Sequence, residues 1–225
     1  MSTSTWPVTL GDVSADEVSP RPRRWRGREP DLRVRDRRDR LVAAAFDLLA
    51  SQGAAAVTMR GVCREAGLTE RYFYESFADR SELLQAVLER VVDDALTVIG
   101  GVVSSSDPRT LLVDVVTAFT AFLDADPRRA RVLFEEAVTT PDLARPGLAL
   151  VQRFVDVVEV GFARTGLVPS TADPVDTALD AAAAFGVLSR LFAARSAGRL
   201  PVDDTRFVTH VVALLTAIAA TTTAP

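Results

Sequence analysis

Residues 58–80, TMRGVCREAGLTERYFYESFADR, hold the side chains of this chain that are best suited to recognising a charged, hydrogen-bonding surface. Arg71, Tyr72, Tyr74 and Glu75 crowd one short segment of it. An arginine guanidinium can donate two hydrogen bonds to O6 and N7 of guanine, and hydroxyl and carboxylate groups can meet other base edges or phosphate groups. This combination indicates a segment that reads the major groove of DNA.

Two short helices are expected to hold these side chains. The first should begin at Thr58, whose hydroxyl can accept a hydrogen bond from a free helical N–H, and should end at Gly67, which adopts positive φ easily. Thr69 is expected to cap the second helix in the same way as Thr58 caps the first.

Apolar spacing predicts which face of the second helix is buried. Phe73 and Phe77 are four residues apart and share a face with Leu68, so these side chains should pack on Val62 of the first helix. The polar side chains then point outward, as a helix-turn-helix requires. A plain helical hairpin has the same turn spacing and remains the alternative.

A longer stretch, residues 37–88, closely resembles the N-terminal domain of the tetracycline-repressor (TetR) family. The resemblance is carried by Ser51-Gln52-Gly53 at the end of a first helix, Val57-Thr58-Met59-Arg60, Ala66-Gly67-Leu68-Thr69, Phe73-Tyr74-x-x-Phe77, and Arg80-Ser81-Glu82-Leu83-Leu84 at the start of a fourth helix.

The resemblance implies a set of DNA-binding residues, among which Arg71 and Ser76 depart from the usual family pattern and should alter the operator sequence. Arg80 replaces a frequent lysine and keeps its charge, so a phosphate contact is expected there. Base-edge candidates are Glu70, Arg71, Tyr72 and Glu75; phosphate candidates are Thr58, Tyr74 and Arg80; Arg60, Thr69 and Ser76 complete the candidate interface.

The distribution of charge supports a nucleic-acid partner although the whole chain has a net charge of −4. Residues 21–80 hold fourteen arginines against nine acidic residues, so the remainder of the chain is strongly acidic. Residues 1–34 are predicted to be a disordered arm, rich in arginine from residue 21, in which no helix starts much before Asp31. Such an arm can follow the DNA backbone, and a merely solvated tail is the alternative.

The composition argues against an enzyme and against metal or cofactor sites. Cys63 is the only cysteine and His210 the only histidine. No metal-ligand spacing, phosphate-binding glycine loop or nucleophile motif occurs, so no cofactor or metal is expected. No targeting segment stands out, and the expected location is therefore the cytoplasm, with no membrane association.

From residue 81 onward, apolar periodicity and stop signals predict only helices. The fold class is therefore all-α, with about nine helices in a DNA-binding domain at residues 35–80 and a ligand-binding and dimerisation domain at residues 81–225. The second domain should contain helices at about 81–103, from Asp107-Pro108 to 125, from Asp126-Pro127 to about 140, at 145–165, at 175–197 and at 203–220.

The last two helices have apolar residues on more than one face, which predicts a partner surface. The resemblance implies that these helices pair across a two-fold axis into a four-helix bundle, so the chain should be a homodimer on a palindromic operator. Burial within a single chain is the alternative. The interface candidates are Leu179, Ala182, Ala183, Gly186, Val211, Leu214, Leu215 and Ile218.

Helices four to seven are expected to enclose a space for a small apolar or amphipathic ligand, which the resemblance also implies. The apolar candidates are Leu96, Phe119, Phe122, Leu123, Phe134, Val138, Phe154, Val158 and Phe162. The polar candidates are Arg131, Glu135 and Arg153. Ordinary core packing, for the aromatic residues, and solvated ion pairs, for the polar ones, are the alternatives.

Together these observations predict a homodimeric repressor that a small molecule releases from its operator by a population shift. The alternative is a regulator with the same fold that acts without a ligand or under the control of a partner, either as an activator or as a constitutive repressor.

Overall fold

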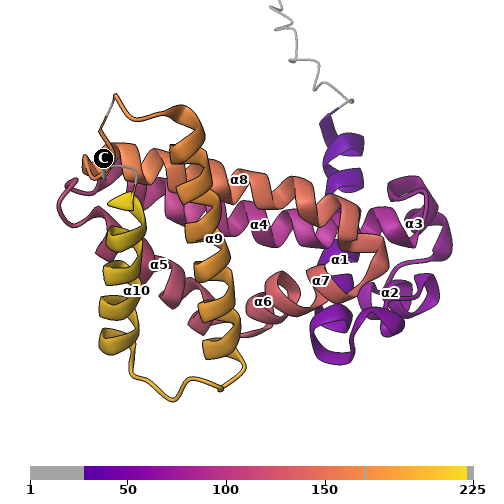
Figure 1. Cartoon of the computed structure of the whole chain (residues 1–225). Coiled ribbons are helices and arrows are strands. Elements are labelled where there is room, and N and C mark those ends of the chain that lie inside the picture. Colours follow the sequence, from indigo (N-terminus) through magenta and orange to yellow (C-terminus); the bar gives the residue numbers. More distant parts are fainter. Residues whose placement is uncertain (1–27, 170, 222–225) are drawn as a thin grey trace, which may run out of the picture.

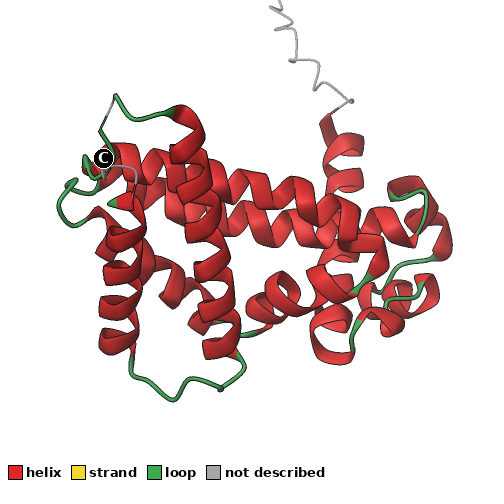
Figure 2. Ribbon diagram, viewed as in Figure 1, coloured by secondary structure: helices red, strands yellow, loops and turns green. Residues whose placement is uncertain are grey.

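The computed structural model describes residues 28–169 and 171–221 (Figure 1). Within these ranges all regular structure is helical and no strand occurs (Figure 2). The described residues form nine helices when the uninterrupted stretch 128–139 is counted once, together with one 3₁₀ turn. The predicted all-α class is therefore confirmed.

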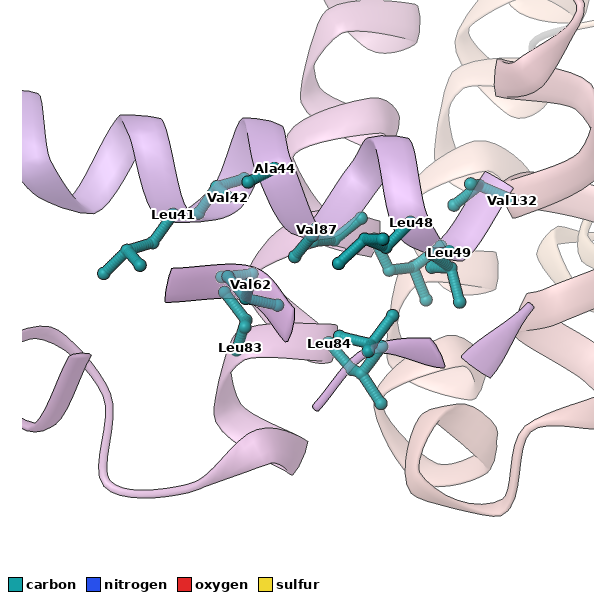
Figure 3. Close-up of a cluster of buried hydrophobic side chains, with 14 of the residues drawn as sticks. Leu41, Val42, Ala44, Leu48, Leu49, Val62, Leu83, Leu84, Val87 and Val132 are labelled. Carbon is teal, nitrogen blue, oxygen red and sulfur yellow. The ribbon is translucent and has the colours of Figure 1, made fainter. Parts of the chain in front are cut away.

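The N-terminal helices pack around one solid core. They are α1 (Arg28–Gln52), the 3₁₀ turn η1 (Ala54–Ala56), α2 (Met59–Ala66) and α3 (Glu70–Ser76). Figure 3 shows side chains from α1, α2 and α4 (Arg80–Ser105) meeting in this core. The core also includes Val132, Leu143 and Leu150, so it extends well beyond the domain boundary expected at residue 80.

Helix α1 begins earlier than the sequence suggested. It starts at Arg28, whereas no helix had been expected much before Asp31 and residues 28–34 had been placed in a disordered arm. Pro30 does not prevent this because the first N–H groups of a helix have no partner within the helix. Residues 1–27, the rest of the expected arm, lie outside the described residues.

The caps of α2 follow the prediction, and the cap of α3 follows it in part. The Thr58 hydroxyl accepts a hydrogen bond from Gly61 N at 3.1 Å, and Gly67 ends α2 with φ of 62°. Thr69 occupies the cap position of α3, but its side chain accepts no hydrogen bond there, so that expectation was wrong.

The rest of the chain forms a helical body. It contains α4 (Arg80–Ser105), α5 (Leu111–Ala125), α6 (Arg128–Arg131), the π-helical segment η2 (Val132–Glu136), α7 (Ala137–Thr139), α8 (Pro141–Thr165), α9 (Pro174–Ser196) and α10 (Asp204–Ala219). Helices α4 and α8 lie side by side and run in the same direction, away from the N-terminal helices (Figure 1). They therefore connect the two parts of the molecule.

Start signals in this body are confirmed at three places and wrong at two. Asp173 and Asp203 accept hydrogen bonds from the first turns of α9 and α10, and α6 follows Asp126-Pro127. Asp107 instead caps a turn, accepting a hydrogen bond from Arg109 N, and α5 starts only at Leu111. Helix α8 starts at residue 141 and not at 145, because a proline can occupy its first turn.

Candidate DNA interface and ligand cavity

The inner and outer faces of α3 divide as the apolar spacing predicted. Phe73 and Phe77 are each only 2% exposed, and Leu68 is half-buried against the same core. Tyr74 is 62% exposed, and Arg71 and Glu75 are also exposed. Helix α3 is therefore held by its buried apolar face, and its opposite face is exposed to solvent.

Acidic residues hold the arginines of this outer face. The Arg71 guanidinium donates to Glu75 at 2.8 Å, and that hydrogen bond raises the pKa of Arg71. Arg60 of α2 donates to Glu70 of α3 at 3.3 Å. Both pairs are exposed, so each contributes little to stability. Their consequence is orientation, because each guanidinium is held by a carboxylate of α3.

Arginines of α1 clamp α3 from its side, which the sequence reasoning missed. The guanidinium of Arg37 lies 4.5 Å from the Tyr72 ring centroid, and that of Arg38 lies 4.1 Å from the Phe77 ring centroid. Arg38 also donates to the Ser76 carbonyl at 2.5 Å. These cation–π contacts leave Tyr72 half-buried. Charge counting assigned these arginines to DNA only in a general way, and could not show that they position the helix.

Arg80 lies in a different environment from the one expected of a phosphate ligand. Its guanidinium donates to the carbonyls of Val57 at 2.8 Å and Ala54 at 2.6 Å, and forms an ion pair with Asp142 of α8. All three of its nitrogen atoms thus have partners inside the protein. In this conformation Arg80 ties α4 to the turn before α2 and to α8.

A cavity of about 510 Å³ lies in the helical body. Residues of α4, α5, η2, α7, α8, α9 and α10 line it, and nearly all of them are apolar. Phe119, Phe134, Phe154, Val158 and Phe162 line it as expected, as does Val138. An apolar space of this size accommodates a small organic ligand.

The other pocket candidates do not line the cavity. Leu96, Phe122 and Leu123 pack in the cores. Arg131 donates to the Ala50 carbonyl of α1 at 2.8 Å. Arg153 pairs with Asp93 at 2.7 Å, and Glu135 is exposed. The three polar candidates are therefore engaged elsewhere or point to solvent.

Helix α9 supplies lining residues that the sequence reasoning had overlooked because it assigned α9 to the dimer. Phe185, Leu188, Ser189 and Phe192 contribute to the wall, and Phe185 stacks on Phe154 with 5.9 Å between ring centroids. The apolar spacing of Phe185, Leu188 and Phe192, at i, i+3 and i+7 in α9, was the available signal.

The segment η2 touches both the cavity and the N-terminal core. Leu133 and Phe134 line the cavity, whereas Val132 is fully buried in the N-terminal core. At the end of η2, Glu136 is 8% exposed and lies 3.6 Å from Arg131. Insertions of this π-helical kind are frequent at functional sites. A change in cavity shape therefore has a short physical route to the end of α1.

The interface candidates separate into two groups. Val211 and Leu215 are 1% and 4% exposed within one chain, so their assignment to an interface was wrong: they belong to the chain's own core. Leu214 and Ile218 are half-buried. On α9, Leu179, Ala182, Ala183 and Gly186 are exposed and lie along one helical face with Val175. That face is apolar and unpartnered in the single chain.

By length and composition alone, α9 could also cross a membrane, and only 17% of its most apolar window is buried within the chain. The exposed face just described accounts for this composition. Among the described residues, no group of histidine, cysteine and acidic side chains could hold a metal ion.

Comparison with known proteins finds similarity to bacterial regulators in the N-terminal helices. Residues 41–87 match the sequence profile of the bacterial regulatory proteins of the tetR family. The HTH-type transcriptional activator FasR of Mycolicibacterium smegmatis is 30% identical over 125 residues, which are 55% of this chain and 57% of FasR. The match thus spans little more than half the length of that relative.

Solved structures share the fold over most of the chain. The fatty acid degradation regulator FadR of Bacillus halodurans has a TM-score of 0.68 at 19% identity, covering 80% of this chain and 94% of that one. FadR of Bacillus subtilis, solved in complex with stearoyl-CoA, also has a TM-score of 0.68, at 14% identity, covering 80% of this chain and 97% of that one. Residues 41–87 are therefore similar in sequence to the tetR family of bacterial regulatory proteins, and the chain shares the fold of these solved structures over most of its length.

Proposed function

We propose that this chain is a homodimeric, ligand-responsive transcriptional repressor that acts in the cytoplasm on a palindromic operator. The observation that carries the proposal is that α4 joins two different sites. Its first half closes the core behind the recognition helix, and Leu88, Val92 and Ile99 line the apolar cavity. A ligand that favours one cavity shape thereby biases the placement of α3.

The DNA-binding part of the proposal rests on the exposed face of α3. Arg71 is the base-reading candidate, because its free guanidinium edge can contact guanine. Glu70, Tyr72 and Glu75 share this face, and Thr58 and Tyr74 remain candidates for phosphate contacts. We assign Arg80 to positioning α4, on the strength of its internal hydrogen bonds.

The dimer in the proposal rests on the exposed apolar face of α9. A row of small residues, Ala182, Ala183 and Gly186, allows the helices of two chains to approach closely. A side-chain carbon added at Gly186 would meet no atom of the same chain within 4 Å, so its own chain does not require this glycine. A two-fold pair through α9 would place two copies of α3 on successive half-sites.

The ligand in the proposal is a small apolar or amphipathic molecule that enters the cavity. The Bacillus subtilis FadR structure shows that a protein with this fold can hold stearoyl-CoA. The cavity of the present chain has the apolar lining that a hydrocarbon tail requires, and the two chains are 14% identical.

The test is fluorescence anisotropy of the purified protein on the DNA upstream of its own gene, over a salt series, for wild type and Arg71→Ala. We expect tight wild-type binding with a steep salt dependence, and a loss of about 1–3 kcal/mol in the variant that is confined to one position of each half-site. An equal loss on every DNA sequence would make Arg71 a phosphate contact.

A reporter assay on the same promoter determines the sign of regulation. Repression predicts higher expression when the gene for this protein is deleted. The FasR relative carries the name of an activator, and lower expression after deletion would show that this chain acts in that way as well.

A further inference from the structure

The cavity is elongated, and its two ends differ. Along α4 its lining residues run from Leu88 to Val103, which corresponds to about 22 Å of helix. A volume of about 510 Å³ that extends over this length, with a lining that is almost entirely apolar, suits an extended hydrocarbon chain.

Exposure of the lining residues locates the opening. Among the lining residues only Val138 of α7, Ala144, Leu148 and Val151 of α8, and Arg190 of α9 are exposed. Val138 and Leu148 are 77% and 73% exposed although they are large and apolar. These five residues therefore form the rim of the mouth, and an apolar chain that enters there would cover them.

Arg190 is the charged residue of the lining. Within the part of the chain that the structure describes, its guanidinium has no hydrogen bond and no ion pair, whereas Arg80, Arg131 and Arg153 are all engaged. A positive charge at the mouth of an otherwise apolar tube is suited to an anionic head group that stays close to water.

Gly161 lies in the last part of α8, away from the exposed rim residues in the first half of that helix. It is buried and lines the cavity beside Phe162, and a side-chain carbon built there would meet nothing within 4 Å. A glycine inside a helix is unfavourable by about 1 kcal/mol relative to alanine. Here it leaves open the space into which the end of a chain would extend.

We infer that the ligand is an anionic amphiphile with a single, long, unbranched hydrocarbon chain, whose head lies at Arg190 and whose tail ends at Gly161. Carbon–carbon bonds of about 1.5 Å advance an extended chain by about 1.25 Å per carbon, so the roughly 22 Å over which α4 lines the cavity corresponds to about 16 to 18 carbons. Arg190 thus selects the charge of the ligand, and Gly161 its length. This inference deepens the proposed function and rests on it for its regulatory meaning.

Chain-length selection is tested by calorimetric titration with saturated carboxylates of 8, 12, 16 and 18 carbons, below their micelle concentrations. Wild type should bind the 16- and 18-carbon chains most tightly. Gly161→Leu should weaken these at least tenfold and leave the 12-carbon chain unchanged. Gly101→Leu is the matched control, because this exposed helical glycine also has nothing within 4 Å of an added side-chain carbon but does not line the cavity.

The outcomes that would overturn length selection are equally definite. Binding that is independent of chain length in wild type, or an identical response of Gly161→Leu and Gly101→Leu, removes Gly161 from its role. Circular dichroism checks that both variants fold. If Gly161→Leu does not fold, Gly161→Ala replaces it. This smaller substitution should weaken binding of the 18-carbon chain by less than the tenfold expected of Gly161→Leu and should leave binding of the 12-carbon chain unchanged.

Head-group selection is tested with hexadecanoate, hexadecanoyl-CoA and neutral hexadecanol. Arg190→Gln should weaken the binding of both anions at least tenfold and leave the binding of hexadecanol unchanged. Arg164→Gln is the control, because Arg164 is an exposed arginine near the C-terminal end of α8, and it should change the binding of none of the three compounds. Tighter binding of the thioester than of the acid would identify a nucleotide-linked source of the anion. Equal binding of the alcohol and both anions by wild type would overturn the role of Arg190.

These titrations contain no DNA, so their failure is distinct from failure of the proposed function. Binding of the hydrocarbon ligands without operator binding would leave the inference intact and defeat the proposed repressor. Operator binding without binding of these ligands would support the DNA-binding function and defeat the inference.

Discussion

The N-terminal core is filled, whereas the helical body beside it is hollow. In the first, α1, α2, α3 and half of α4 bury their apolar side chains against one another, and charged side chains cover the outside. In the second, helices of similar composition leave a tube of about 510 Å³. Apolar content alone therefore does not distinguish a core that positions a helix from one that awaits a ligand.

The two regions should respond differently to the removal of a large side chain, which is the largest effect we predict. Phe73→Ala should lower the free energy of unfolding by about 3–5 kcal/mol, because a fully packed site cannot collapse around the new void. Phe134→Ala should cost less than about 2 kcal/mol, because this half-buried ring already borders empty space. Urea denaturation followed by circular dichroism measures both.

Equal losses in the two variants would contradict the comparison and show that the cavity is filled in solution. Phe119→Ala provides a second cavity-lining variant, since this ring also packs edge-on against Phe192 with 4.8 Å between centroids and so should fall between the two.

The residues of the recognition helix could be predicted from sequence because their signals are local. Thr58 and Gly67 determine the ends of α2 through contacts within a few residues, and the four-residue spacing of Phe73 and Phe77 determines the buried face of α3. Only the cap at Thr69 and the start of α1 differed.

The cavity and the contacts between the two regions could be predicted only in part, because they depend on which helices pack against each other in the folded chain. Arg80 and Asp142 are 62 residues apart, and no periodicity along the chain links them. Arg131 likewise reaches Ala50, 81 residues away. Phe185 belongs to a helix whose other face, at Leu179 and Ala182, carried the stronger sequence signal.

A substitution at Arg80, which connects the two regions, should have an effect of intermediate size. Arg80→Lys keeps the charge but cannot donate simultaneously to Val57, Ala54 and Asp142. Unfolding free energy should fall by about 1–3 kcal/mol, since partly buried carbonyl groups lose their donor. Urea denaturation measures this loss.

The salt dependence of DNA binding separates the two roles of Arg80. If it only positions α4, Arg80→Lys should weaken binding on all sequences without changing the salt slope. A slope that falls by about one unit per half-site in Arg80→Ala and is restored in Arg80→Lys would instead return Arg80 to the phosphate contacts. Asp142→Asn serves as the control, because it removes the ion pair with Arg80 and leaves the charge of Arg80 in place.

The smallest predicted effect concerns the empty end of the tube. Gly161→Ala should stabilise the protein by about 1 kcal/mol, because alanine favours the helix and its methyl group meets no neighbour within 4 Å. Gly101→Ala on α4 should give a similar gain, since it has the same open surroundings at an exposed position. Thermal unfolding of both variants without ligand measures the difference. The contrary outcome is that Gly101→Ala is stabilised while Gly161→Ala is less stable than wild type. It would mean that the helices close on Gly161 in solution, and that the hollow region packs as tightly as the N-terminal core until a ligand opens it.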